Sequence, residues 1–247
     1  MIEYSNYTAD YLKYCHYHKR LSNKTNSAYR IDLAQYQSFS YELTKQSLWD
    51  YIEHLNKLYN PKTAKRKIAT LKAFLHYLIV QDLINCNPFD KIEITIKEPL
   101  LLPKTIPLDI IEKLITYAYQ QIISAKTNYQ LRCTVRNTAI IELLFGTGAR
   151  VAEICNLQEA DVNFQGKSVK LYGKGSKERI IPIENESVLS ILHRYRSLHE
   201  SQIKALGFFF VNKLGKRMSE QSVRSMLNAY CQHCEIDVHI TPYMFRH

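Results

Sequence analysis

The chain has 247 residues, of which 46% are hydrophobic and 23% are charged, and its formal net charge is +10. This length suits one large domain or two small ones, and the hydrophobic content is ample for packed cores. No apolar run approaches the roughly 18 residues that a membrane span needs, and the first residues do not form a signal peptide. We therefore expect a cytoplasmic protein without a membrane partner, and the positive charge favours nucleic acid as the partner.

The first hundred residues are predicted to be mostly helical. Apolar spacings of three and four predict one helix over about 26–40, another that contains Leu48, Ile52 and Leu55, and a third that begins at Asn60-Pro61. Asparagine suits the N-cap and proline the first helical position. The third helix has an apolar stripe that includes Ala64, Ile68, Leu71, Leu75 and Leu78, and its basic residues lie largely off that stripe.

A proline-rich segment follows the helical half. Asn85-Cys86-Asn87-Pro88 is predicted to end the helical run, and prolines at 99, 103 and 107 favour an extended segment. This pattern predicts an N-terminal domain over 1–97, a linker over 98–107 and a C-terminal domain over 108–247.

The C-terminal half mixes helix and strand. Helices are expected around Ile110–Leu114 and Val135–Leu144, and the glycines of 146–148 are expected to interrupt the second one. Strands are expected over 168–171 and 179–183, with a hairpin signal at 173–176, and a strand with a turn over 208–215. The later part is predicted to hold a helix capped by Ser219, and a last helix opened by Thr241-Pro242 with Tyr243 and Arg246 on one face.

The six cysteines give no disulfide framework, because four of them are scattered singly. Cys231 and Cys234 form one close pair with His239 nearby. A structural zinc site needs four ligands, usually as two close pairs. We expect a reduced pair of thiols at a helix end, no metal and no other cofactor.

Three basic residues can carry phosphoryl-transfer chemistry. Arg150 and Arg246 are permanently charged forks that match two phosphate oxygens, and Lys174 stands between two glycines that let the backbone approach DNA. Taken singly, each also fits a surface charge, a hairpin tip or a terminal charge. Their order and context favour a shared site on one phosphate.

Three short boxes follow one another along the chain: Gly148-Ala149-Arg150-Val151-Ala152-Glu153, residues 173–179 and residues 241–247. They resemble, in this order, the first arginine box, the β-hairpin lysine motif and the opening of the His-x-x-Arg box of one protein family. This family is the tyrosine recombinases, also called phage integrases, and the resemblance is to their Xer-like and transposon-integrase branch. The N-terminal half is similar to the SAM-like core-binding domain of the same family, including residues 60–66.

The resemblance implies a fold and a chemistry. The fold would be mainly α with small β elements: a SAM-like helical domain followed by an incomplete mixed α+β catalytic domain. Arg150 and Arg246 would clamp the scissile phosphate, and Lys174 would be the general acid toward the 5′ leaving oxygen. Glu153 would support Arg150, and His247 would have at most a supporting role. The family forms a 3′-phosphotyrosyl link to double-stranded DNA, without a metal or a small-molecule substrate, and works as a homo-tetramer on DNA.

The same resemblance implies DNA contacts outside the catalytic residues, with a solvated helix face as the open alternative. These candidates share a basic side chain on the third helix or on the hairpin. They are Lys62, Lys65, Arg66, Lys72, Lys177 and Arg179.

Two departures from the family pattern affect the expected activity. Tyr243 stands where the family has histidine, and a phenol titrates near 10, so it cannot replace an imidazole. The second His/Trp box and the nucleophilic tyrosine are not found after Arg246. We expect a C-terminally truncated recombinase that binds DNA without cleaving it. A naturally shortened, non-catalytic regulator of recombination remains the alternative.

Overall fold

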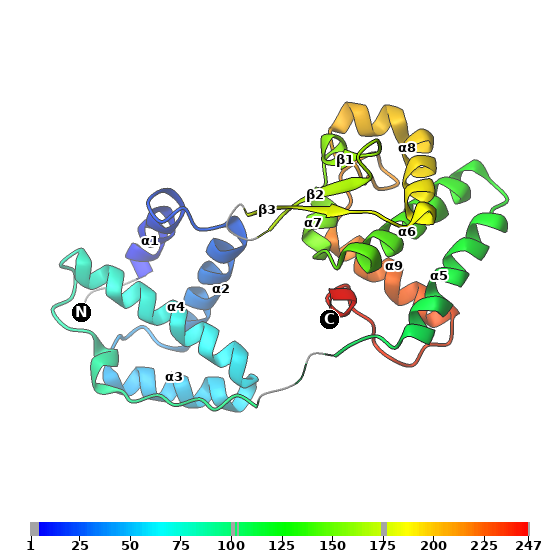
Figure 1. Ribbon diagram of the computed structural model, residues 1–247. Helices are drawn as coiled ribbons and strands as arrows, with labels where there is room; N and C mark the ends of the chain where they lie inside the picture. Colours follow the sequence, from blue (N-terminus) through cyan, green and yellow to red (C-terminus); the bar gives the residue numbers. More distant parts are fainter. Residues whose placement is uncertain (1–4, 100–101, 103, 174–176, 247) are drawn as a thin grey trace. The chain divides into compact units, whose positions relative to one another are not determined.

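The computed structural model describes residues 5–99, 102, 104–173 and 177–246, and Figure 1 shows the elements. The chain divides into two compact units, Met1–Leu101 and Leu102–His247. The boundary between them falls inside the proline-rich segment of 98–107. Within the described residues the structure is mostly helical with one small sheet, so the predicted fold class is confirmed.

The N-terminal unit is built from four α-helices and a 3₁₀ turn within its described residues. They are α1 (Ser5–Tyr17), α2 (Asn23–Phe39), α3 (Lys45–Leu58), α4 (Pro61–Val80) and η1 (Pro88–Lys91). The predicted start of α4 is confirmed: the Asn60 side chain accepts a hydrogen bond of 2.9 Å from the Thr63 amide, and Pro61 is the first helical residue. The helix α2 begins three residues earlier than predicted, because Ser22 caps it through the Thr25 amide.

The core of this unit lies between α1, α2, α3 and α4, and Phe89 of η1 joins it. The predicted stripe of α4 is buried, with Leu71 at 1% exposure and Leu75 and Leu78 at 0%. Lys67 of the same helix is also buried, at 3% exposure, next to Asp32 of α2, at 1%. The apolar periodicity gave no sign of this ion pair inside the unit.

The C-terminal unit contains both helices and strands. Its elements are α5 (Leu108–Ile123), α6 (Asn128–Thr147), α7 (Val151–Asn156), η2 (Glu159–Asp161), β1 (Val162–Asn163), β2 (Ser168–Tyr172), β3 (Glu178–Pro182), α8 (Glu186–Leu206), α9 (Glu220–His233) and η3 (Met244–Arg246). The strands form an antiparallel sheet in the order β1-β2-β3, with Val169 opposite Ile181 and Leu171 opposite Arg179. The predicted hairpin strands and the Ser219 cap of α9 are confirmed.

The long helix α6 is the centre of this unit. It contacts α5, α7, α8 and η3, and its middle turns from Ala139 to Leu144 are almost entirely buried (Figure 1). A helix packed on several sides loses its polar face, which explains why the apolar stretch of 139–144 is nearly continuous.

The segment of 146–148 interrupts the helix as predicted: α6 ends at Thr147, and Gly148 caps it in a left-handed conformation (φ 56°). Two other expectations for this unit were wrong. Within the described residues, 208–215 forms isolated bridges, Gln158 to Phe208 and Val211 to Arg217, rather than a strand.

The segment opened by Thr241-Pro242 forms the 3₁₀ turn η3 instead of an α-helix. Its hydrogen bonds join residues three apart: the Met244 amide donates to the Thr241 carbonyl and the Arg246 amide to the Tyr243 carbonyl. Met244 and Phe245 are buried against the unit, and this packing favours the tight turn.

A search of the described helices for membrane spans finds none with the required length and apolar character.

Candidate functional site

The end of α6 positions the first arginine. The Gly148 amide donates to the Leu144 carbonyl at 3.0 Å and closes the helix in the left-handed cap that glycine favours. Ala149 is fully buried, and Arg150 is the N-cap residue of α7. The turn therefore leaves the Arg150 side chain 46% exposed at the surface while its backbone is fixed.

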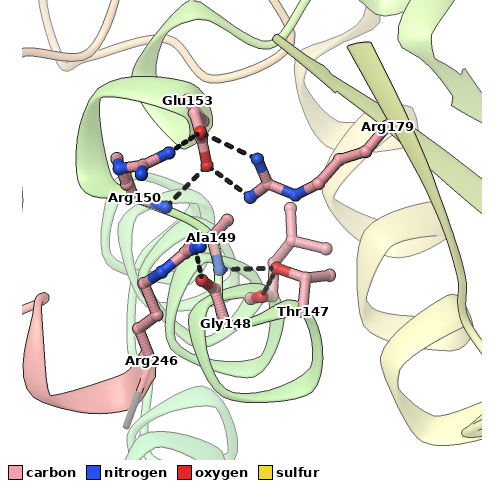
Figure 2. A network of polar contacts seen from close by, with 8 residues as sticks. Thr147, Gly148, Ala149, Arg150, Glu153, Arg179 and Arg246 are labelled. Carbon is pink, nitrogen blue, oxygen red and sulfur yellow. Dashed lines mark hydrogen bonds and ion pairs between the residues drawn. The ribbon is translucent and has the colours of Figure 1, made fainter. Parts of the chain in front are cut away.

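A buried carboxylate holds that arginine. Glu153, whose side chain is 3% exposed, accepts from the Arg150 amide at 2.8 Å and from the Arg150 Nη1 at 2.9 Å. Arg179 of β3 donates to the same carboxylate through Nη1 at 3.0 Å and Nη2 at 2.6 Å. Figure 2 shows the two guanidinium groups on either side of Glu153. Glu153 thus joins α7 to the hairpin strand β3.

The charge state of this carboxylate follows from its donors. Burial alone would raise the pKa of Glu153, but the hydrogen bonds from Arg179 and from the Arg150 backbone and side chain outweigh it. The pKa is lowered to about 2. Glu153 is therefore ionised throughout the neutral range and orients both arginines.

The second arginine arrives at the same turn from the far end of the described chain. Arg246 donates through Nη1 to the Gly148 carbonyl at 3.2 Å, although 98 residues separate the two. It is exposed, while its neighbours Met244 and Phe245 are buried in the core. Figure 2 shows the Arg246 side chain beside Gly148, two residues before Arg150 in the chain. The structure thus brings two of the three predicted phosphate-binding residues to one turn.

The remaining catalytic candidates are Lys174, His247 and Tyr243. Lys174 and His247 are outside the described residues. The Gly173 amide donates to the Lys177 carbonyl at 2.7 Å, which ties together the residues on either side of 174–176. Tyr243 is 61% exposed and stands at the start of η3, three residues before Arg246.

The predicted DNA-binding residues divide into two groups. Lys62, Lys72 and Lys177 are exposed, and the Lys72 ammonium lies 5.3 Å from the centre of the Phe89 ring. The others are bound to carboxylates: Lys65 to Glu98 at 2.9 Å, Arg66 to Asp32, and Arg179 to Glu153.

Sequence reasoning missed the group that Arg66 joins. Asp32 accepts hydrogen bonds from Arg66, from Lys67 at 2.9 Å and from the Thr70 hydroxyl at 3.0 Å. Gln35 also accepts from Lys67. The one available signal was an acidic residue next to Leu33 on the buried face of a helix, a position where aspartate is rare unless it is paired.

Cys231 and Cys234 are buried free thiols at the end of α9. Over the described ranges, no group of three or more histidine, cysteine, aspartate or glutamate side chains is placed to hold a metal ion. The chemistry offered by the described site is therefore that of fixed guanidinium groups, which bind planar or tetrahedral oxyanions through paired hydrogen bonds.

Comparisons with known proteins identify the family of both units. Residues 112–247 match the phage integrase family, and residues 9–82 match the N-terminal SAM-like domain of phage integrases. A tyrosine recombinase of Agathobacter rectalis is 49% identical over 244 residues, which cover 97% of this chain and 80% of that protein.

Solved structures show the same fold at low sequence identity. Lambda integrase residues 75–356 bound to DNA matches with a TM-score of 0.74 and 13% identity, covering 99% of this chain and 84% of that one. A lambda integrase tetramer bound to a Holliday junction matches with a TM-score of 0.72 and 14% identity, covering 100% of this chain and 71% of that one.

Proposed function

The chain belongs to the phage integrase family, and we propose that it is a site-specific DNA recombinase that acts on duplex DNA in the cytoplasm. DNA would be cut and rejoined through a 3′-phosphotyrosyl intermediate, within a homo-tetramer that holds two duplexes. The observation that carries the proposal is the meeting of Arg150 and Arg246 at the Gly148 turn. The net charge of +10 supports DNA as the partner.

The two guanidinium groups would stabilise the reacting phosphate. Attack on a phosphodiester builds negative charge on the non-bridging oxygens, and arginine forks can accept that charge without proton transfer. An arginine that contacts a phosphoryl transition state is worth about 10³–10⁵ in rate in comparable enzymes. Glu153 supports this role because its two hydrogen bonds fix the orientation of Arg150, while its own side chain is buried.

We assign Lys174 as the general acid. A tyrosine hydroxyl would lose its proton to solvent and its oxygen would bond to phosphorus. The bond to the 5′ oxygen would break, and the lysine would give its proton to that oxygen. The contact between Arg179 and Glu153 supports this role, because it ties the strand that follows the lysine to the helix that follows Arg150. Arg179 would then position the hairpin rather than contact DNA.

The proposal includes no attacking group among residues 1–247. Tyr243 is exposed, but it stands three residues before Arg246, where the family has histidine, so we assign it a phosphate contact. Residues 1–247 would therefore bind DNA without becoming covalently joined to it.

Phosphate neutralisation tests the arginine site. Selection from a pool of random duplexes would first give the bound sequence, and single methylphosphonate groups would then be placed along it. We expect one position at which neutralisation weakens binding by about tenfold, the effect of losing a charged hydrogen bond. In Arg150→Gln and Arg246→Gln the same change should have less than about a twofold effect, because the contact is already lost. Arg224→Gln, which changes an exposed arginine of α9, is the matched control.

If every position remains equally sensitive in Arg150→Gln and in Arg246→Gln, the two arginines do not share a phosphate and the proposal fails.

A nicked suicide duplex tests the missing nucleophile. DNA cleaved on such a substrate cannot be rejoined, so a covalent adduct accumulates. We expect residues 1–247 to bind the duplex and to form no adduct that survives denaturation. An adduct lost in Tyr243→Phe would assign the nucleophile to Tyr243.

A further inference from the structure

A second basic site lies at the amino end of α6, away from the Gly148 turn. A pocket of about 310 Å³ opens there between α6, α8 and the segment after Val211. Its walls combine basic, amide and aromatic side chains: Asn128, Tyr129, Arg132, Cys133, Arg136, His199, Gln202, Asn212 and Lys213. With about 1.5 Å of rise per residue, Arg132 is roughly 20 Å along the helix from Thr147. The pocket is therefore separate from the candidate active site.

The charge of the pocket is uncompensated. Its lining holds Arg132, Arg136 and Lys213 and no aspartate or glutamate. Arg136 is only 9% exposed, and its hydrogen bonds go to neutral oxygens: the Asn137 side chain at 3.0 and 3.3 Å and the Val211 carbonyl at 3.5 Å. A buried cation is costly unless a counter-charge is near, so this arginine favours an anion in the pocket.

Arg132 has neutral partners as well. It donates through Nη2 to the Gln202 carbonyl oxygen at 2.6 Å and approaches His199 Nδ1 at 3.3 Å. His199 Nε2 lies 3.2 Å from the Arg132 carbonyl oxygen, and Nδ1 lies 3.0 Å from the Gln202 side-chain oxygen. Burial lowers the pKa of His199, which keeps the ring neutral near pH 7. The histidine therefore neither adds to nor offsets the positive charge.

The position of the pocket adds to the same preference. Asn128 is the first residue of α6, a helix of 20 residues whose first turn contains no acidic side chain. The amino end of a helix carries partial positive charge, so an anion there gains from the helix as well as from the arginines. Tyr129, which is 58% exposed, provides an aromatic wall at this end.

We propose that this pocket binds a small phosphate-bearing anion, with Arg132 and Arg136 on the phosphate and Lys213 at the rim. Arginine pairs that are fixed by neutral hydrogen bonds present a preformed fork to a tetrahedral oxyanion. A small ligand fits the site better than a DNA backbone, because it can enter far enough to reach Arg136, a residue that is only 9% exposed. Binding at this pocket would not require the proposed recombinase activity.

Cys133 provides a reporter inside the pocket. It lines the site and is partly exposed, whereas Cys86 is exposed in the N-terminal unit. An anion beside Cys133 would cover the thiol and disfavour its thiolate, and both effects slow alkylation. The probe is inorganic pyrophosphate, with sodium chloride at equal ionic strength as the reference. Iodoacetamide labelling of each cysteine is followed by peptide mass spectrometry, without DNA.

We expect pyrophosphate to slow labelling of Cys133 at least threefold and to leave Cys86 unchanged. In Arg132→Gln the protection should disappear, and in Lys213→Gln it should weaken. Arg194→Gln, an exposed arginine of α8, makes the same charge change outside the pocket and should keep full protection. Circular dichroism of each variant shows whether it folds, and Lys213→Gln keeps the test valid if Arg132→Gln does not.

Four results would overturn the proposal. Pyrophosphate could slow the labelling of Cys133 and Cys86 equally, or it could leave Cys133 unprotected. The protection of Cys133 could also persist in both pocket variants, or it could be lost in Arg194→Gln as in Arg132→Gln. A further comparison of tripolyphosphate with ATP identifies the source of the phosphate: stronger protection by ATP that falls in Tyr129→Ala supports a nucleotide, and equal protection supports the phosphate group alone. Protection by a short duplex DNA and not by pyrophosphate would contradict a small ligand.

Discussion

Each unit contains one nearly buried carboxylate that binds two basic side chains, but the surroundings differ. Asp32 binds Lys67, whose side chain is 4% exposed, together with Arg66 and Thr70. Glu153 binds Arg150 and Arg179, whose side chains are 46% and 32% exposed. Asp32 thus neutralises a cation inside the N-terminal unit and joins α2 to α4. Glu153 holds cations whose other sides face solvent.

The difference separates a structural ion pair from one suited to ligand binding. A buried ammonium cannot reach a ligand, and it requires its carboxylate in order to stay charged. An exposed guanidinium keeps free hydrogen-bond donors after it has paired, because its fork has five of them. In the first unit the carboxylate therefore neutralises the buried Lys67. Arg66, which is 46% exposed, and the two arginines of the second unit keep donors toward solvent.

The largest expected effect is in the N-terminal unit. Asp32→Asn should lower the free energy of unfolding by about 3–5 kcal/mol, because Lys67 would remain buried without a counter-charge. Urea denaturation followed by circular dichroism measures this. Glu53→Gln removes an exposed pair with Lys57 and should leave the stability almost unchanged, because solvent screens the pair. Equal costs for the two variants would remove the distinction between the buried pair and a surface pair.

A smaller loss is expected in the C-terminal unit. Glu153→Gln should lower the free energy of unfolding by about 1–3 kcal/mol, because Arg150 and Arg179 can turn to water once their carboxylate is gone. The same denaturation measures it, with Glu178→Gln, which removes an exposed pair with Lys170, as the control. A cost larger than that of Asp32→Asn would reverse the comparison.

The pH dependence of the stability tests the contacts of Glu153 further. The pKa of Glu153 is lowered to about 2, below its unfolded value of about 4.3. A lowered pKa in the folded state gives stability that is complete above the unfolded pKa and is lost as the pH falls through the folded pKa. The stability difference between the natural chain and Glu153→Gln should be constant from about pH 7 to 5 and should narrow from about pH 4.3 toward 2. A difference that stays constant down to about pH 3 would mean that arginine contacts do not lower the Glu153 pKa.

The smallest effects concern DNA binding. Arg150→Gln should reduce the slope of log K against log salt by about 0.9, the value for one phosphate contact. Lys62→Gln should reduce it by the same amount without changing the stability, because Lys62 is exposed. Fluorescence anisotropy at several salt concentrations measures both. An unchanged salt slope in Lys62→Gln would show that Lys62 does not contact a DNA phosphate. An unchanged slope in Arg150→Gln would show the same for Arg150.

Local patterns in the sequence predicted the parts of this structure that depend on neighbouring residues. Asn60-Pro61 predicted the start of α4, and the β-prone stretches on either side of 173–176 predicted β2 and β3. Arg150 and Arg246 were selected from short boxes, and their common turn could be expected only from the family resemblance. Nothing in the spacing of two residues 96 positions apart indicates that they meet.

The errors have a common physical cause, which is packing that the local pattern does not contain. Thr241-Pro242 is a good helix start, yet the burial of Met244 and Phe245 selects a 3₁₀ turn. Packing also gives Arg179 a partner that the local pattern does not contain, because Glu153 comes from a helix 26 residues earlier. A side chain's partner is fixed by tertiary structure, and apolar periodicity reports only which side is buried.

The peptide unit at Gly148 links both arginines through a single backbone geometry. Glycine adopts its positive φ readily, whereas other residues would be strained there. The Gly148 carbonyl accepts the hydrogen bond from Arg246, and Arg150 follows two residues later in the chain. A Cβ added at this position would stand in a strained backbone conformation, 3.7 Å from the Cα of Arg246. The placement of both positive groups therefore depends on a residue that is neither of them, and a redesign of Gly148 would act on both at once.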